Sequence, residues 1–283
     1  MERNFFDVEI DYDVDNNLKK QDVWKLIEWT KEEPHLPEIN EAQAILFLQR
    51  WQYQNEITRD AVDSYFTFKT YCPELLVRGD LSSLDVSLIT LLPKTPDGTN
   101  IVYIRLLDVD ADKFDLATQM VHLDMTLMSN LYKEGNFNGY VVIVDMLDVP
   151  FNVISKLDPL QLKKILFYLQ EVVPLRLKAI HYVHTKSFMT QFLNLVKALV
   201  KSDILVTENH SIECLAKYFP KDCLPEEYGG SAGNLTVLHE KSKRRFLENA
   251  ALFNWEDRQA ADENRRPPDN KILTNIVTFF HNK

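Results

Sequence analysis

The sequence predicts an α/β fold with a mostly parallel sheet, preceded by a small all-α domain. From about residue 100 onward, short apolar segments alternate with longer segments whose apolar side chains follow helical spacing. This alternation is typical of parallel strands joined by crossover helices. The first 90 or so residues show helical spacing and no such alternation, which indicates a separate helical unit.

The N-terminal region is expected to contain three helices after an acidic, aperiodic start at residues 1–16 that we expect to be a loop. Residues 18–31 and 41–51 have helical periodicity, and the breaker PHLP lies between them. Asn40 is the predicted N-cap of the second helix. A proline ends the third predicted helix, residues 58–72.

The second region is predicted to supply the sheet. The segment VVIVD (141–145) is apolar at nearly every position, as expected for a strand that is buried on both faces. The other predicted strands are residues 101–107, 177–184 and 203–208, and the predicted helices are 116–133, 158–174 and 188–200. We therefore expect a helical domain at 1–92, the sheet domain at 93–232 and a helical extension at 233–283, with a helix over 242–261 and a last docking segment, KILTNIVTFF.

The net charge of −10 is unevenly distributed along the 283 residues. Residues 1–150 hold 13 Lys/Arg and 27 Asp/Glu, a net charge of −14, whereas residues 151–283 hold 19 and 15, a net charge of +4. An acidic first half excludes general nucleic-acid affinity, so we expect no nucleic-acid partner. This asymmetry could orient the less acidic second half toward an anionic surface. Alternatively, it reflects only an ordinary scatter of solvated charges without a function.

The cysteine spacing and the hydropathy of the sequence together predict a cytosolic protein. The three cysteines show no CxxC spacing, which predicts free thiols in the cytosol. The acidic N-terminus lacks the apolar core of a secretory signal. The sequence contains no run of about 18 apolar residues, so we predict no membrane span. We expect a cytoplasmic protein.

Motifs for catalysis, cofactors and metals are absent from the sequence. It contains no GxGxxG, GxxxxGK[ST], GxSxG or HExxH, so we predict no catalytic residues, no cofactor and no metal. His181 and His184 are three residues apart on a predicted strand and point to opposite faces, so they cannot chelate one metal together. Asp145 and Asp148 follow a strand at the end where α/β sheets bind ligands, and either a catalytic or a turn-stabilising role remains open.

The predicted helix 188–200 has more apolar side chains than one buried face requires. Phe188, Phe192 and Leu195 are among them. The helix at 116–133 adds several methionines, which suit an irregular apolar surface. From these residues alone, a thick ordinary core and an apolar binding site both remain possible.

Four segments give the sequence a family resemblance: residues 45–75, GYVVIVDMLDV (139–149), LQEVVPLRLKAIHYVH (169–184) and LPEEYGG (224–230). With them the chain resembles the CRAL-TRIO lipid-binding family, in particular its cellular retinaldehyde-binding and alpha-tocopherol transfer protein-like branch. The resemblance implies a cup-shaped sheet around an apolar cavity, with residues 188–200 as a helical lid that opens at membranes. It also explains the surplus apolar surface of that helix.

The resemblance further implies a monomeric, non-catalytic carrier that moves a small hydrophobic lipid between membranes and contacts the membrane surface only transiently. The lipid would be a retinoid, a tocopherol-like lipid or another isoprenoid. A polar side chain, Tyr103, His181 or Tyr182, would orient its head. The lipid-contacting residues that the resemblance implies are Tyr103, Met125, Met128, Ile143, Phe151, Phe167, His181, Val183, Phe188, Phe192, Leu195, Val196 and Leu199.

Other functions stay open. A phosphoinositide-binding or phospholipid-binding member is one, although the family's basic stretch before the fourth strand is replaced here by VKSDILVTE. The basic residues of KSKRR (241–245) could substitute for it. A second alternative is an interaction module whose pocket is filled by its own side chains, and a third is a lipid hydrolase that uses Asp145 or His184.

The closing motif LPEEYGG is interpreted as structural rather than as a site. Gly229 and Gly230 permit positive φ and a close backbone approach where the chain turns back across the domain. Tyr228 is expected to pack its ring on the domain while its hydroxyl finds a partner.

Overall fold

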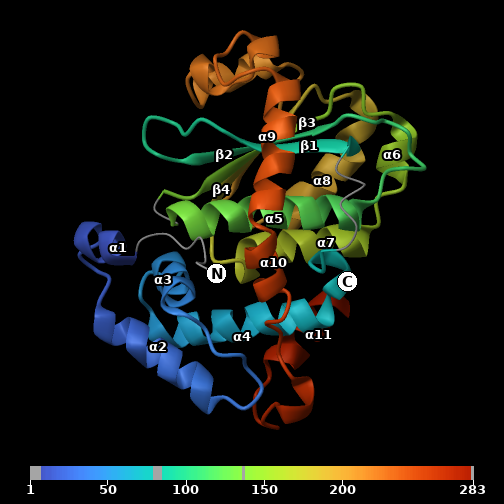
Figure 1. Ribbon diagram of the computed structural model, residues 1–283. Helices are drawn as coiled ribbons and strands as arrows, with labels where there is room; N and C mark the ends of the chain where they lie inside the picture. The colour runs from blue at the N-terminus through green and yellow to red at the C-terminus, as the bar shows by residue number, and fades with distance from the viewer. Residues whose placement is uncertain (1–7, 79–84, 136–137, 282–283) are drawn as a thin grey trace.

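The computed structural model describes residues 8–78, 85–135 and 138–281, and within them five strands form one sheet. Figure 1 shows helices lying against this sheet. The strands follow one another in chain order across the sheet. They are β1 (Ser87–Leu92), β2 (Asn100–Leu106), β3 (Tyr140–Asp145), β4 (Leu177–Val183) and β5 (Leu205–Glu208). β1 pairs antiparallel with β2, and the remaining neighbours pair in parallel, so the predicted mostly parallel sheet is confirmed.

Strand β1 was not predicted from the sequence. It pairs with β2 along its whole length, from Ser87 opposite Leu106 to Leu92 opposite Ile101. The sheet therefore begins inside the region that was expected to be entirely helical. The predicted boundary at residue 92 falls after this strand rather than before it.

The helices of the N-terminal region lie close to their predicted positions, except the first of them. They are α1 (Val8–Val14), α2 (Lys20–Glu32), α3 (Glu41–Arg50) and α4 (Asn55–Tyr71). Asn40 caps α3 as predicted, because its side chain accepts from the Gln43 backbone N–H and Gln43 bonds back to the Asn40 backbone N–H. Helix α1 lies where a loop was expected, and residues 1–7 of that expected loop lie outside the described residues.

Within the described residues, four α-helices lie between consecutive strands of the chain: α5 (Leu116–Glu134), α6 (Phe151–Ser155), α7 (Pro159–Phe167) and α8 (Thr190–Leu199). Figure 1 shows α5 and α7 next to each other below the sheet. Asp158 caps α7 as predicted by accepting from the Leu160 N–H, and α7 continues into a π-helical stretch, Tyr168–Val172. The short helix α6 was not predicted.

The C-terminal extension packs on both the sheet and the N-terminal helices. It contains α9 (Leu235–Glu248), α10 (Ala250–Glu256) and α11 (Ile272–His281). Helix α9 packs on β1 and α5, and α11 packs on α4 and α7. The helix predicted over 242–261 is therefore two helices that meet at Asn249, and the predicted docking segment is α11.

The apolar core has two parts, one on each face of the sheet. The larger part is continuous from α2–α4 through α5 and α7 to one face of the sheet. The smaller part lies on the opposite face, beneath residues 212–238. The N-terminal helices and the sheet thus share one core, and the boundaries of the helical domain and of the extension remain predictions.

Candidate functional site

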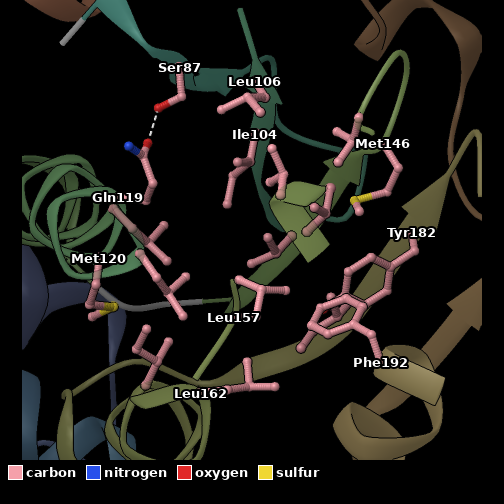
Figure 2. Close-up of a pocket in the computed structure, with 18 of the residues that line it drawn as sticks. Ser87, Ile104, Leu106, Gln119, Met120, Met146, Leu157, Leu162, Tyr182 and Phe192 are labelled. Atoms are coloured by element: carbon pink, nitrogen blue, oxygen red, sulfur yellow. Dashed lines mark hydrogen bonds between the residues drawn. The ribbon is translucent and has the colours of Figure 1, made fainter. Parts of the chain in front are cut away.

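A cavity of about 190 Å³ lies between the larger core's sheet face and helices α5, α6, α7 and α8. Figure 2 shows the side chains that surround it. Alternate residues of four adjacent strands form its floor, because successive side chains of a strand point to opposite faces. These residues are Ser87 and Ile89 of β1, Ile104 and Leu106 of β2, Val142 and Val144 of β3, and Ile180 and Tyr182 of β4.

Two helices supply the opposite wall. Their lining side chains are three or four residues apart, the spacing that places them on one helix face. They are Gln119, Met120 and Leu123 of α5, and Leu162, Ile165 and Leu166 of α7. The lining is therefore apolar apart from a few polar side chains, which is the usual character of a site for a hydrophobic ligand.

Helix α8 closes one side of this cavity. Phe192 lines the cavity and meets the Tyr182 ring edge-on, with ring centroids 5.9 Å apart. Leu193 and Val196 are fully buried beneath the helix, whereas Asn194 on its outer side is exposed. The helix thus covers this side of the cavity.

The C-terminal end of α8 is tied to the π-helical stretch by one side chain. The Gln170 amide nitrogen donates to the Leu199 carbonyl at 3.3 Å, and the Gln170 amide oxygen accepts from the Lys201 backbone N–H at 2.7 Å. The Gln170 side chain is itself buried. This clamp fixes the C-terminal end of α8 to the wall of the cavity.

Among the described lining residues, Asp145 and Tyr182 are the ones that can titrate, and no Lys, Arg or His is present. Burial alone would raise the pKa of Asp145. Hydrogen bonds from Tyr103, Tyr228 and His184 outweigh this effect and bring its pKa below the usual value. The Asp145 carboxylate is therefore an ionised and fully hydrogen-bonded group.

Tyr182 is different, because its side chain is only 6% exposed and burial is what raises its pKa. No hydrogen bond to its hydroxyl is present within the described residues. Of the three side chains proposed from the sequence as head-orienting groups, Tyr182 is the one that lines the cavity.

The predicted site residues on the sheet lie on the opposite face from the cavity, which corrects the predicted lining. Tyr103, Ile143 and His181 occupy matching positions on three neighbouring strands, so they share one face, and Val183 belongs to the same side. Tyr103 donates to Asp145 at 2.5 Å there. His181 contacts Thr207 at 2.7 Å. These side chains form the smaller core.

The predicted site residues on helices α5 to α7 also lie outside the lining. Met125 and Met128 are buried in the larger core. Phe167 meets the Phe280 ring of α11 edge-on, with ring centroids 5.3 Å apart. Phe151 of α6 is 62% exposed, and its ring lies 5.9 Å from that of Phe188, so these two form an apolar pair at the surface.

Helix α8 carries the remaining predicted residues. Phe192 lies in the cavity lining. Leu195, Val196 and Leu199 pack against the larger core without lining the cavity. Whether any predicted residue contacts a lipid stays a prediction.

Gln119 and the floor residues other than Tyr182 were missed from the sequence. A usable signal was present in α5, where Leu116, Gln119, Met120 and Leu123 follow helical spacing and place an amide within an apolar stripe. Asp148, considered as a catalytic carboxylate or a turn residue, has φ of 62°, the left-handed conformation that Asp tolerates in turns. This geometry favours the turn role.

The fold and the cavity together define a class: an α/β protein with an apolar cavity between sheet and helices, closed on one side by a helix. The chain belongs to the CRAL/TRIO domain family, whose model matches residues 85–230. The matched range begins just before β1 and ends at Gly230 of the LPEEYGG motif, and it contains every described residue that lines the cavity.

Curated relatives agree with this assignment. The chain is 26% identical over 215 residues to proteins named "Alpha-tocopherol transfer protein-like" from Homo sapiens and Pongo abelii. The alignment covers 72% of this chain but 63% of those relatives, so the chain spans less than two thirds of their length. Clavesin-1 from Xenopus laevis is 26% identical over 102 residues, which is 35% of this chain and 31% of that protein.

One solved structure, of Sfh5, covers 92% of this chain and 97% of its own at 11% sequence identity, with a TM-score of 0.48. The family assignment rests on the family model and not on this likeness. None of the helices that the structure describes combines the length and the apolar character needed to cross a bilayer.

Proposed function

We propose that the chain binds one small hydrophobic lipid in this cavity and transfers it between membranes without covalent chemistry. The observation that carries the proposal is the apolar cavity of about 190 Å³ beside Phe192. Protein interiors are otherwise packed with few voids larger than a water molecule. An interaction module whose pocket is filled by its own side chains would leave no such space.

The ligand class follows from the lining and the relatives. Relatives named for tocopherol transfer favour an isoprenoid lipid, either tocopherol-like or a retinoid. A ligand that buries about 400 Å² of apolar surface gains about 10 kcal/mol before the cost of ordering ligand and lid is subtracted. That gain is enough for stable carriage without charged contacts.

The size of the cavity implies that the lid must move. Pockets for drug-sized ligands enclose about 300–1,000 Å³, whereas this cavity has about 190 Å³. A whole isoprenoid lipid therefore requires α8 to shift outward. Because Gln170 holds the C-terminal end of α8, we propose that the N-terminal end opens.

The same movement would bring the protein to a membrane. Phe188, next to the N-terminal end of α8, and Phe151 already form an apolar pair at the surface. Exposed apolar side chains of this kind can insert at a lipid interface. We therefore propose transient contact with membranes from the cytosol by a monomer, with the lid open only while it is in contact.

The residues suspected of catalysis have structural partners. His184 Nδ1 lies 2.7 Å from an Asp145 carboxylate oxygen, and the other oxygen accepts from Tyr103 and Tyr228. We propose no reaction at this cluster. In the basic segment KSKRR (241–245), Lys243 already pairs with Asp85 at 2.8 Å. Because this cation is committed to a carboxylate, we propose lipid carriage rather than phosphoinositide binding.

Native mass spectrometry of the purified chain, followed by organic extraction, tests the proposal. We expect one lipid per chain, or one α-tocopherol or retinaldehyde molecule after incubation with loaded phosphatidylcholine vesicles. Transfer of the same molecule to acceptor vesicles should depend on protein concentration. A chain that carries no adduct before or after loading, and transfers nothing, would contradict the proposed function.

A further inference from the structure

A second hollow, separate from the apolar cavity, lies between the C-terminal ends of α5 and α9. Figure 1 shows these two helices crossing, and they pack on each other. This α5–α9 hollow has a volume of about 270 Å³ and shares none of its described lining residues with the apolar cavity. The lining residues are Ser129, Asn130, Lys133 and Glu134 of α5, Arg245 and Glu248 of α9, and Asn249, at which α9 ends. All of them are polar or charged, so the hollow suits a polar ligand.

The hollow has a buried floor and a more exposed rim. Ser129 and Asn130 are only 3% and 5% exposed, and their side chains donate hydrogen bonds to neighbouring protein groups. Lys133 and Glu248 are exposed. The floor is therefore held in place by the protein itself, and the charged side chains of the rim are left to meet a ligand.

Arg245 is a partly buried cation in this hollow. Its guanidinium forms no ion pair and no hydrogen bond within the residues that the structure describes. Burial lowers the pKa of Arg245, because the attraction of Glu134 and Glu248 does not offset the loss of solvent. An arginine side chain nevertheless stays charged. An anionic ligand group would supply the missing counter-ion through charge-assisted hydrogen bonds.

The unpaired charges of the hollow define the charge of its ligand. Glu134 is already paired with Lys94, at 2.6 Å. Lys133 and Arg245 supply two positive charges and Glu248 one negative charge, and none of these three has an ion pair among the described residues. Their net charge is +1. A ligand with two negative charges and one ammonium group would pair with each of them.

A plain dianion such as inorganic phosphate fits this arrangement less well. Both α5 and α9 end at the hollow, and the C-terminal end of a helix carries partial negative charge. Glu248 adds a full negative charge on the same side of α9 as Arg245, because residues three apart on a helix have Cβ atoms about 5–6 Å apart. A molecule whose anion and ammonium group are a few bonds apart can contact both residues.

We propose that the α5–α9 hollow binds a small amine-bearing dianion, with its negative charges on Arg245 and Lys133 and its ammonium group on Glu248. Soluble O-phosphoethanolamine has this chemistry, and so does the headgroup of phosphatidylserine in a membrane. The site lies outside the apolar cavity and is independent of the proposed lipid carriage.

Three soluble probes test the charge requirement in calorimetric titrations at low salt. They are O-phosphoethanolamine, ethyl phosphate, which lacks the amine, and ethanolamine, which lacks the phosphate. At pH 8 the phosphate groups are doubly charged, because their second pKa is about 6. The Kd of O-phosphoethanolamine should be about two- to fivefold lower than that of ethyl phosphate, the effect of an exposed ion pair. Ethanolamine should bind more weakly than both, and tighter binding of ethanolamine would overturn the proposal.

Two variants of α9 locate the anionic group. Arg245→Met should raise the Kd values of both phosphates at least about tenfold, because it removes the partly buried cation. Arg244→Met removes the same charge from the adjacent residue, which is exposed and does not line the hollow, so it should leave both Kd values unchanged. Equal losses in the two variants would attribute binding to the overall charge of α9 and overturn the site.

Glu248→Gln locates the ammonium group. This variant should lose the preference for O-phosphoethanolamine and bind ethyl phosphate at least as tightly as the original protein, because a repelling carboxylate is gone. Retained ethyl phosphate binding would also show that the hollow is intact in the variant. A preference for O-phosphoethanolamine that survives Glu248→Gln would overturn the proposed contact.

Vesicle sedimentation distinguishes a soluble ligand from a lipid headgroup. Phosphatidylserine and phosphatidylglycerol have the same net charge, but only phosphatidylserine has an ammonium group. A preference for phosphatidylserine vesicles that Glu248→Gln abolishes would identify the headgroup as a ligand. Binding of O-phosphoethanolamine without this preference would identify a soluble ligand. Absence of both would overturn the proposal and leave the carrier function standing, because neither measurement involves the apolar cavity.

Discussion

Tyr228 donates a hydrogen bond to Asp145 at 2.5 Å, although 83 residues separate them in the chain. The carboxylate is buried at the end of the central strand β3, and the tyrosine belongs to LPEEYGG, after the last strand. His184 contacts the other oxygen of the same carboxylate at 2.7 Å. The closing motif is thus anchored by a charged group of the sheet, which accounts for the aromatic residue beside the glycine pair.

Tyr228→Phe should lower the free energy of unfolding by about 1–3 kcal/mol, because it removes one donor from a buried carboxylate. Tyr182→Phe is the matched control, since it also removes a buried hydroxyl, but one without a partner within the described residues. Denaturant unfolding at pH 7 should show the loss in the first variant only. Equal midpoints for Tyr228→Phe and the original protein would contradict the anchoring role.

The effect of Tyr228→Phe should also depend on pH. The pKa of Asp145 is lower in the folded protein than its usual value of about 3.9. A lowered carboxyl pKa stabilises the folded state above the unfolded pKa, and this contribution is lost as pH falls through the folded pKa. The stability difference between Tyr228→Phe and the original protein should therefore be full at pH 7 and shrink below about pH 4. A difference that grows on acidification would contradict this assignment.

The two glycines of LPEEYGG should respond differently to alanine. Gly229 has φ of 71°, and a Cβ there would lie 2.6 Å from the Lys221 Nζ, which can move. Gly229→Ala should therefore cost about 1–2 kcal/mol of backbone strain. A Cβ on Gly230 would lie 1.9 Å from the Leu224 carbonyl oxygen, so the backbone itself must shift. Thermal unfolding should show a larger loss for Gly230→Ala, and the reverse order would contradict the predicted packing.

Local signals made much of the fold predictable. Caps such as Asn40 and Asp158 and the helical spacing within α3, α5, α7 and α8 depend on residues close in sequence, and these elements were predicted within a few residues. Strand β1 was missed because its pairing with β2 is not visible locally. Its segment SLITLL, before the turn at TPDGTN, nevertheless has the β-branched and aliphatic composition of a strand.

The cavity lining could not be read from the strands, because both faces of the sheet are apolar. Val142 and Ile143 are both buried aliphatic residues, yet Val142 faces the cavity and Ile143 the smaller core. Without polar–apolar alternation, no local signal distinguishes one face of the sheet from the other. A prediction that chooses the wrong face therefore assigns every strand residue of the site to the wrong side. Tyr103 and His181 were misplaced for this reason.

A buried ion cluster should make the C-terminal extension important for stability. Arg78 contacts Asp124 of α5 at 2.7 Å and Glu256 of α10 at 3.1 Å, and all three side chains are nearly inaccessible. Arg78→Met leaves these carboxylates short of a cation and should cost about 3–5 kcal/mol. Lys94→Met, which breaks an exposed pair with Glu134, should cost less than about 1 kcal/mol. Similar losses in denaturant unfolding would contradict the structural role of the cluster.

The lid assignment predicts that a charge on the inner side of α8 impairs lipid retention. Phe192 lines the cavity and packs on Tyr182, so Phe192→Asp places a carboxylate where no cation is available among the described lining residues. Lipid occupancy in native mass spectrometry should fall at least about tenfold, the effect of about 1.4 kcal/mol. Binding to phosphatidylcholine vesicles should weaken as well, because α8 would be less able to insert.

Asn194→Asp is the matched control for this prediction. It adds the same charge two residues along the same helix, on a side chain that is exposed in the closed lid. Neutral phosphatidylcholine vesicles exclude simple repulsion by an anionic surface, so this variant should retain its lipid and its vesicle binding. Equal losses in both variants would attribute the effect to added charge on α8 alone. A carboxylate in the lining of an occupied apolar cavity must lower the affinity for the lipid, because burying an unpaired charge costs free energy. Unchanged lipid occupancy and vesicle binding in Phe192→Asp would therefore show that α8 does not close over the ligand.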